Sequence, residues 1–133
     1  MTEIMQSIHK AWDSLIFAGS KNLELRKSKP IGIRYPAKVY IYETKQFGGC
    51  GMVVGDYVLK FEPSESLFEN RDKLMSILSV HSCVSPQDIM NYHAGKGTIY
   101  AWRISNVQKY DHPMNLTDFG LEKAPQSWCY LNR

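Results

Sequence analysis

Three charged residues that lie close together in the chain, Lys21, Glu24 and Arg26, are the best placed to do chemistry. Apolar and polar side chains alternate around them, as they do in a β-strand with one buried face. Leu23 and Leu25 then point to one side of the strand, and Glu24 and Arg26 point to the other. A carboxylate and a guanidinium at this spacing are close enough to pair, and Lys21 stands at the entrance of the same face.

Two interpretations of this charged face remain open from the residues themselves. An exposed strand face carries a weak surface ion pair, worth about 0–1 kcal/mol. A charged cluster at the mouth of a barrel or cleft contacts a ligand instead. The surrounding charge fits either a basic patch or a solvated loop, because seven basic residues lie between positions 21 and 45 and only Glu24 and Glu43 oppose them. The seven are Lys21, Arg26, Lys27, Lys29, Arg34, Lys38 and Lys45.

The length and composition set limits on the class of protein. A chain of 133 residues with 44% apolar residues is expected to form one domain over residues 1–133 with its own core. The net charge of +3 permits nucleic-acid binding without requiring it. No apolar run approaches the roughly 20 residues of a membrane-spanning helix, so no membrane partner is expected.

The cysteines and histidines show no spacing typical of a metal site. Cys50, Cys83 and Cys129 form no Cys-x-x-Cys pair, which predicts neither a disulfide framework nor structural zinc and favours a reducing, cytoplasmic location. The four histidines also lack metal-ligand spacing. We therefore expect no metal and no cofactor.

Strand and helix signals occur in groups along the chain, which favours an α+β fold. In the helix at residues 10–18, Ala11, Leu15 and Ala18 share a face that Trp12 and Ile16 widen. The large apolar side chains of this face are expected in the core. Gly55, inside a strand pattern, predicts a bulge or a close backbone approach. The expected elements are a short strand within residues 1–9, a helix at 10–18, strands at 22–27, 38–44 and 52–61, helices at 70–80 and 85–95, a strand at 98–107 with 109–112 as its extension or a further strand, a single helical turn at 116–119 and a closing segment at 124–131.

The second predicted strand leaves the position of its tyrosines open. Val39 and Ile41 point to one face, and Tyr40 and Tyr42 point to the other. The tyrosines either lie beside the charged face, where they stack on a base, or pack against a neighbouring strand.

The pattern Gly-x-Lys-x-x-Glu-x-Arg after a short helix resembles the signature of the ASCH domains, a branch of the PUA-like superfamily. Residues 39–45 resemble the second strand of that family with its Thr-Lys end, and residues 124–131 resemble its closing Pro-Gln-Ser segment. This resemblance implies an α+β fold built on a small mixed β-barrel of about five or six strands, with short helices around it. The matching residues are Gly19, Lys21, Glu24, Arg26, Thr44, Lys45, Pro125, Gln126 and Ser127.

The resemblance also implies a ligand-binding cleft at the barrel mouth, which takes RNA or a nucleotide in RNA metabolism or translation. Phosphates are expected to meet the lysines of the motif. Arg26 offers a planar fork to a phosphate or a base edge, and Glu24 accepts hydrogen bonds from a base or holds Arg26 in position. Tyr42, with Tyr40 or Trp128, stacks on a base. The remaining expected contacts are Lys21, Lys27 and Lys45 for phosphate, and Thr44, Gln126 and Ser127 as neutral polar groups.

Two enzyme activities are the alternatives, and both make Lys21 and Glu24 the catalytic candidates. Some small ASCH proteins are amidohydrolases that act on N4-acylated cytidine with a lysine, a threonine and a distant glutamate. The lysine matches Lys21, but Glu24 stands where those enzymes carry threonine, and Glu65 and Glu69 are candidates for the distant glutamate only by rough position. A ribonuclease would use Lys21 and Glu24 as acid and base on a 2′-hydroxyl.

Overall fold

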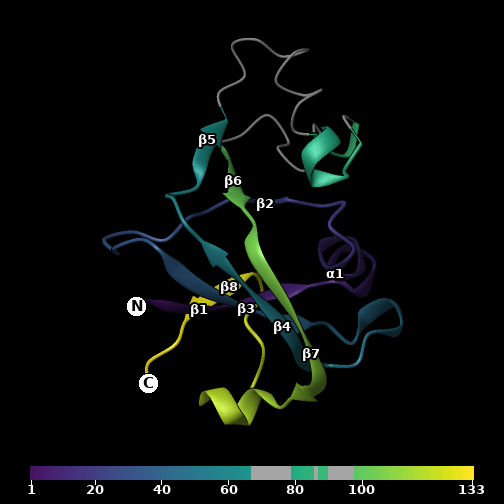
Figure 1. The fold of residues 1–133 in the computed structure, drawn as a ribbon, viewed down its shortest axis with the longest axis vertical. Coiled ribbons are helices and arrows are strands. Elements are labelled where there is room, and N and C mark those ends of the chain that lie inside the picture. Colours follow the sequence, from purple (N-terminus) through teal and green to yellow (C-terminus); the bar gives the residue numbers. More distant parts are fainter. Residues whose placement is uncertain (67–78, 86, 90–97) are drawn as a thin grey trace.

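The computed structural model describes residues 1–66, 79–85, 87–89 and 98–133, and these residues form two β-sheets with short helices (Figure 1). A five-stranded sheet has the order β7-β4-β3-β1-β8, and a three-stranded sheet has the order β2-β6-β5. The elements are β1 (Glu3–Ile8), α1 (Lys10–Phe17), β2 (Leu23–Arg26), β3 (Ala37–Glu43), the 3-10 turn η1 (Gln46–Gly48), β4 (Met52–Leu59), β5 (Ser64–Ser66), β6 (Ile99–Arg103), β7 (Ser105–Met114), the 3-10 turn η3 (Leu116–Phe119) and β8 (Trp128–Tyr130).

The α+β class is confirmed, but the described residues contain eight strands rather than about five or six. β5 and β8 have three residues each, which is too short for a side-chain period to show in the sequence. β6 and β7 are separated by Ile104 alone, and the chain bends there from the smaller sheet into the larger one. The Ile104 N–H donates to the Asn22 carbonyl at 2.9 Å, which fixes this bend against the start of β2.

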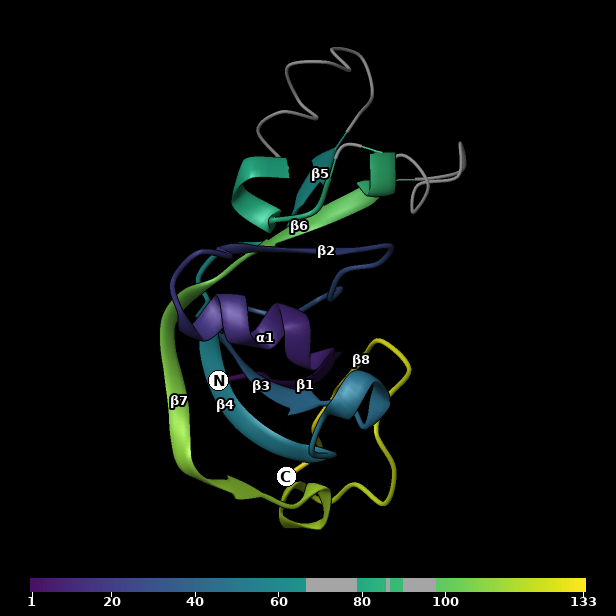
Figure 2. The same cartoon turned by 90° about the vertical axis from the view of Figure 1, so that its right-hand side faces the viewer.

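The larger sheet curves around α1 (Figure 2). Gly55 lies in β4, opposite Ile41 of β3. The pairing of β4 with β3 shifts register between Ile41 and Tyr42, next to this glycine. A Cβ atom at position 55 would lie 2.4 Å from the Gln108 carbonyl oxygen and 2.7 Å from the Phe17 ring. The predicted close backbone approach is therefore confirmed.

The predicted core positions of the helix at residues 10–17 are confirmed for Trp12 and Ile16, but the two alanines at the edge of the predicted face do not share them. Ala11 and Ala18 are exposed, whereas Ile16 is buried and Trp12 is half-buried against the main core. The larger side chains of Trp12 and Ile16 remove more apolar area from water than the alanines would. Asp13 is buried on the same turn of the helix, which apolar periodicity does not predict.

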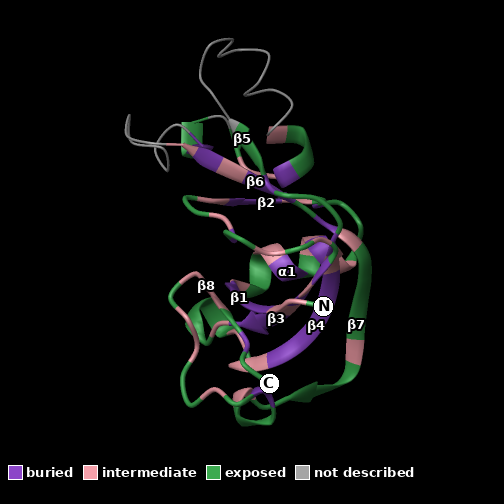
Figure 3. Ribbon diagram, turned by 90° about the vertical axis from the view of Figure 1, so that its left-hand side faces the viewer, coloured by how far each residue is buried: buried purple, intermediate pink, exposed green. Residues whose placement is uncertain are grey.

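The core lies on both faces of the larger sheet, and its central strands β1, β3 and β4 are mostly buried (Figure 3). Val39 and Ile41 belong to the main apolar cluster, which also holds Ile16 of the helix. Tyr40 and Tyr42 face the other way, into a second cluster closed by Phe119 and Leu131. This is the packing alternative for the two tyrosines.

Two further predictions concern the ends of short helices. The turn at Leu116–Phe119 is confirmed, with the Asn115 N–H donating to the Asp118 carboxylate at 3.1 Å and Gly120 in the left-handed conformation (φ 78°). Residues 79–82 and 87–89 are helical. The other parts of the helices predicted at 70–80 and 85–95 fall mainly outside the described residues.

In the parts that the structure describes, no helix is long and apolar enough to cross a membrane.

Candidate functional site

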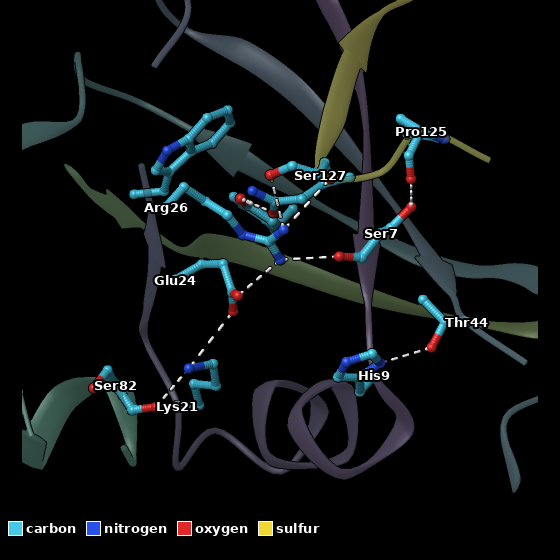
Figure 4. Close-up of polar contacts among 12 residues, drawn as sticks. Ser7, His9, Lys21, Glu24, Arg26, Thr44, Ser82, Pro125 and Ser127 are labelled. Carbon is cyan, nitrogen blue, oxygen red and sulfur yellow. Dashed lines mark hydrogen bonds and ion pairs between the residues drawn. The ribbon is translucent and has the colours of Figure 1, made fainter. Parts of the chain in front are cut away.

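A cleft with a volume of about 440 Å³ opens between α1, β2, the helical residues near position 88 and the segment before β8. That volume falls within the range of small-molecule sites. One side carries the charged residues of β2, and another carries residues from the end of β1 and the end of β3 (Figure 4). The lining residues are Ser7, His9, Trp12, Lys21, Glu24, Leu25, Arg26, Thr44, Val84, Asp88, Ile89 and Gln126.

Lys21, Glu24 and Arg26 form a buried chain of charges along this cleft. The Arg26 Nη2 atom lies 2.9 Å from Glu24 Oε1, and the Lys21 Nζ atom lies 3.5 Å from Glu24 Oε2. Lys21 is 3% exposed and Glu24 is 6% exposed. The interpretation of this face as an exposed surface ion pair is therefore wrong.

The local fold explains why these charges face inward. Leu25 belongs to a small apolar cluster with Ile89 and Ala101, and Leu23 packs against the same cluster. Since side chains alternate along β2, Glu24 must face the opposite side, toward the interior between the two sheets. The predicted alternation is confirmed, and it is what carries a carboxylate into the protein.

Arg26 also links the two sheets. Its Nη2 atom donates to the Ser7 carbonyl of β1 at 2.9 Å, and its Nη1 atom donates to the Ser127 hydroxyl at 3.1 Å. The Ser7 hydroxyl donates in turn to the Pro125 carbonyl at 2.7 Å. One guanidinium thus connects β2 with β1 and with the segment before β8 (Figure 4).

Lys21 is held by three groups around its ammonium. Nζ donates to the Ser82 carbonyl, pairs with Glu24, and lies 5.1 Å from the centre of the Trp12 ring. Burial lowers the pKa of Lys21 below its ordinary value, and the charge of Glu24 opposes this shift. A lysine in such surroundings loses its proton more easily than a surface lysine, which is the property of lysines that act in proton transfer.

Thr44 was predicted at the site, but its partner in a second polar pair, His9, was not. His9 Nδ1 and Thr44 Oγ1 share a hydrogen bond of 2.8 Å, with the donor set by the tautomer of the ring. Both residues line the cleft. The pair forms because β1 and β3 run parallel with Ile8 opposite Glu43, so the residues that follow these two come together. No local sequence signal carries this register.

Of the other predicted binding residues, the structure brings some to the cleft and not others. Gln126 and Thr44 line it, whereas Ser127 is outside the lining and accepts a hydrogen bond from Arg26, which is part of it. Lys45 is exposed, and its side chain lies along Gly51. Lys27 is exposed and is not part of the lining. Tyr42 is 7% exposed in the second core cluster, so it is not brought to the cleft.

The two other aromatic candidates for stacking are also engaged elsewhere. The Trp128 ring lies 5.3 Å from the Trp102 ring, and its Nε1 donates to the Ser28 hydroxyl at 2.9 Å. The Tyr40 hydroxyl donates to the Glu3 carboxylate at 2.6 Å. Neither residue lines the cleft.

The clustered lysines do not make one open basic surface. Lys29 pairs with Glu62 at 2.6 Å, and Lys38 pairs with Asp56 at 3.1 Å. These acids lie outside the segment in which the basic residues cluster, so only the tertiary fold pairs them. Together with the burial of Lys21 and Arg26, this pairing neutralises much of the positive charge seen in the sequence.

Two buried atoms of the charged chain have no hydrogen-bond partner among the residues that the structure describes. They are Glu24 Oε2, which has only the 3.5 Å ion pair with Lys21, and Arg26 Nε. A buried polar atom without a hydrogen bond costs about 1–3 kcal/mol. A ligand or a water molecule that donates to Glu24 would recover part of that cost.

Among the residues that the structure describes, no group of His, Cys, Asp and Glu side chains is arranged to hold a metal ion.

Comparison with solved structures defines the class of fold. A crystal structure of an ASCH protein from Zymomonas mobilis matches with a TM-score of 0.79 and 22% identity, over 98% of this chain and 88% of that one. A variant of it with tyrosine replaced by phenylalanine matches with a TM-score of 0.80 and 21% identity, over 100% and 92%. A variant with serine replaced by alanine matches with 0.75 and 22%, over 98% and 89%. This chain therefore has the ASCH fold. No protein-family model and no curated protein sequence matches it.

Proposed function

We propose that residues 1–133 act as one ASCH domain, which binds RNA by accepting a single nucleotide into the cleft that Lys21, Glu24 and Arg26 line. The observation that carries this proposal is Glu24, a residue of the cleft lining whose buried Oε2 atom has no hydrogen bond to any residue that the structure describes. The exocyclic amino groups of cytosine and adenine are donors that a carboxylate accepts. The ASCH fold itself is consistent with a nucleic-acid partner.

Phosphate contacts belong to the edge of the cleft rather than to its floor. Lys21 and Arg26 already have protein partners and are largely buried, so they favour a neutral base edge over a phosphate. Lys45 follows Thr44, which lines the cleft, and its side chain is exposed. We therefore assign Lys45, with Lys27, to the phosphates, and Gln126, Ser127 and Thr44 to neutral polar contacts.

Binding of short single-stranded RNA and of single nucleosides to Glu24→Gln tests this proposal. The substitution keeps the shape of the side chain but replaces one acceptor oxygen with a donor. We expect the dissociation constant to rise by about 10- to 100-fold, as the loss of one hydrogen bond to a charged group implies. Affinity is measured by fluorescence anisotropy across a salt titration, which separates phosphate contacts from base contacts.

Glu62→Gln is the matched control, because Glu62 also pairs with a lysine but is mostly exposed. It is expected to leave affinity within about twofold of the parent. Thermal melts of both variants must show a folded protein. Equal affinities for Glu24→Gln, Glu62→Gln and the parent would show that the ligand does not contact Glu24.

A hydrolase is the second candidate function, and the cleft offers two groups for it. Lys21 is a buried lysine with a lowered pKa, and the Thr44 hydroxyl is hydrogen-bonded to a histidine ring. A hydroxyl beside a histidine is an arrangement used for nucleophilic attack on carbonyl groups. We infer that the cleft supports hydrolysis of an N4-acylated cytidine, with Lys21 moving a proton and Thr44 or a water molecule attacking.

Release of acetate from N4-acetylcytidine measures this activity directly. We expect turnover by the parent and at least a hundredfold loss in Lys21→Ala and in Thr44→Val. Lys29→Ala, which removes a half-buried lysine with an ion pair outside the cleft lining, is the control and is expected to keep full activity. Parent turnover no greater than that of Lys21→Ala excludes the amidohydrolase, and the same variants incubated with labelled RNA test for ribonuclease activity.

A further inference from the structure

Phe47 combines high exposure with an unusual backbone conformation. Its side chain is 80% exposed, although it lies in a short turn close to the cleft. Its backbone is left-handed, with φ 54° and ψ 38°. Bulky side chains rarely adopt this conformation, which glycine and asparagine adopt much more easily. Apolar burial does not account for an aromatic residue at this position.

The ring of Phe47 contacts a residue of the cleft lining, His9. It stands edge-on to the His9 ring, with 5.3 Å between centroids and 82° between planes. His9 lines the cleft and is fixed by Thr44. The turn is closed at its end by the Cys50 N–H, which donates to the Glu43 carboxylate at 2.8 Å. The aromatic face thus stands in solvent next to a site lined by hydrogen-bonding groups.

We propose that Phe47 stacks on a base of single-stranded RNA, next to the nucleotide that enters the cleft. This inference rests on the proposed function, because it requires RNA in the cleft. Single-stranded RNA is commonly bound by exposed aromatic rings beside polar pockets, since every base offers a flat face to stack on. The strained turn presents the ring to the ligand before binding, so the ring is already ordered when the RNA arrives.

Binding of RNA hexamers to Phe47→Ala, Phe47→Trp and the parent tests the stacking contact. Stacking on one base is worth about 1–3 kcal/mol, so we expect Phe47→Ala to weaken binding by about 5- to 150-fold. Phe47→Trp is expected to bind at least as tightly as the parent, because it keeps a flat aromatic face. Phe61→Ala is the matched control, since Phe61 is another largely exposed phenylalanine, 57% exposed, and contacts the Arg103 guanidinium instead.

A set of hexamers with one abasic position each then identifies the stacked base. Removing the stacked base is expected to weaken RNA binding by the parent. The same removal is expected to leave binding by Phe47→Ala unchanged, because that variant already lacks the ring that contacts the base. Phe47→Asn adds a measurement of the folded state. Asparagine fits the left-handed turn, so its melting temperature is expected to equal or exceed that of the parent while RNA affinity falls.

The outcomes separate this inference from the proposed function. A parent that binds hexamers while Phe47→Ala binds as tightly as Phe61→Ala overturns the stacking contact and leaves the cleft as the site. A parent that binds no hexamer and no nucleoside overturns the proposed function, and the stacking contact with it. A loss in Phe47→Ala that is the same for intact and for all abasic hexamers also overturns the inference, because the ring then acts without a base.

Discussion

Arg26→Ala is expected to destabilise the protein by about 3–5 kcal/mol, the usual cost of removing one partner from a buried ion pair. Glu24 would keep its charge at 6% exposure without the guanidinium that lies 2.9 Å away. The same substitution also removes the donors to Ser7 of β1 and to Ser127 before β8. Chemical denaturation at neutral pH measures the change as a shift of the midpoint.

Lys29→Ala is the matched control for this prediction. Its ion pair with Glu62 is just as short, but the Glu62 side chain is 59% exposed, so the expected loss is about 0–1 kcal/mol. A double variant, Arg26→Met with Glu24→Gln, is expected to recover part of the loss because no unpaired carboxylate remains. A loss for Arg26→Ala as small as that for Lys29→Ala would show that water solvates Glu24 in solution.

The free energy of unfolding of Asp13→Asn is expected to increase relative to that of the parent as the pH rises from about 5 to about 7. Asp13 is 2% exposed on α1, beside the Glu43 carboxyl. Burial and the neighbouring Glu43 raise the pKa of Asp13 to about 8, so Asp13 holds its proton in the folded state at neutral pH. Lys10 and Lys109 act in the opposite direction but do not reverse the shift.

The sign of this effect follows from proton linkage. The folded state binds the Asp13 proton more tightly than the unfolded chain, in which the pKa is about 3.9. The parent therefore has the full contribution of this proton below about pH 4 and loses it as the pH rises toward 8. Asparagine does not titrate, so the difference in free energy of unfolding is expected to grow by roughly 1 kcal/mol per pH unit in this range.

Denaturant melts of both proteins at several pH values measure that difference. Asp111→Asn is the control, because Asp111 is exposed on β7 and its substitution is expected to give a constant offset. A constant offset for Asp13→Asn as well would mean that Asp13 is ionised in the folded protein. Asp13 is also connected to the turn that carries Phe47. Its neighbour Glu43 accepts a hydrogen bond from the Cys50 N–H at the end of that turn.

Local sequence determined the elements that carry the site. The two-residue alternation of Leu23, Glu24 and Leu25 predicted a strand with one apolar and one charged face, and the strand is present. Gly19 ends the first helix with φ 82°, as a left-handed residue does. Asn115 and Gly120 bound the predicted turn before the closing segment. Each of these patterns works because its residues interact within a few positions of one another.

Only the tertiary structure decided which face each strand buries and which residues meet. A period of two separates the faces of β3 but does not say that the second core cluster covers Tyr42. It also does not say that β2 turns its charged face inward, where Arg26 reaches Ser127, 101 positions away. In the same way, Lys29 and Lys38 of the predicted basic patch pair with two acids that lie outside that segment of the sequence.

The cleft itself shows this division most clearly. Lys21, Glu24 and Arg26 are recognisable by spacing, because one short strand carries the two that pair most closely. His9 and Thr44 meet through the parallel register of β1 with β3, and Phe47 contacts His9 because the turn after β3 is closed onto Glu43. Spacing along the chain encodes contacts within one element, whereas contacts between elements depend on register and packing, which are properties of the whole fold.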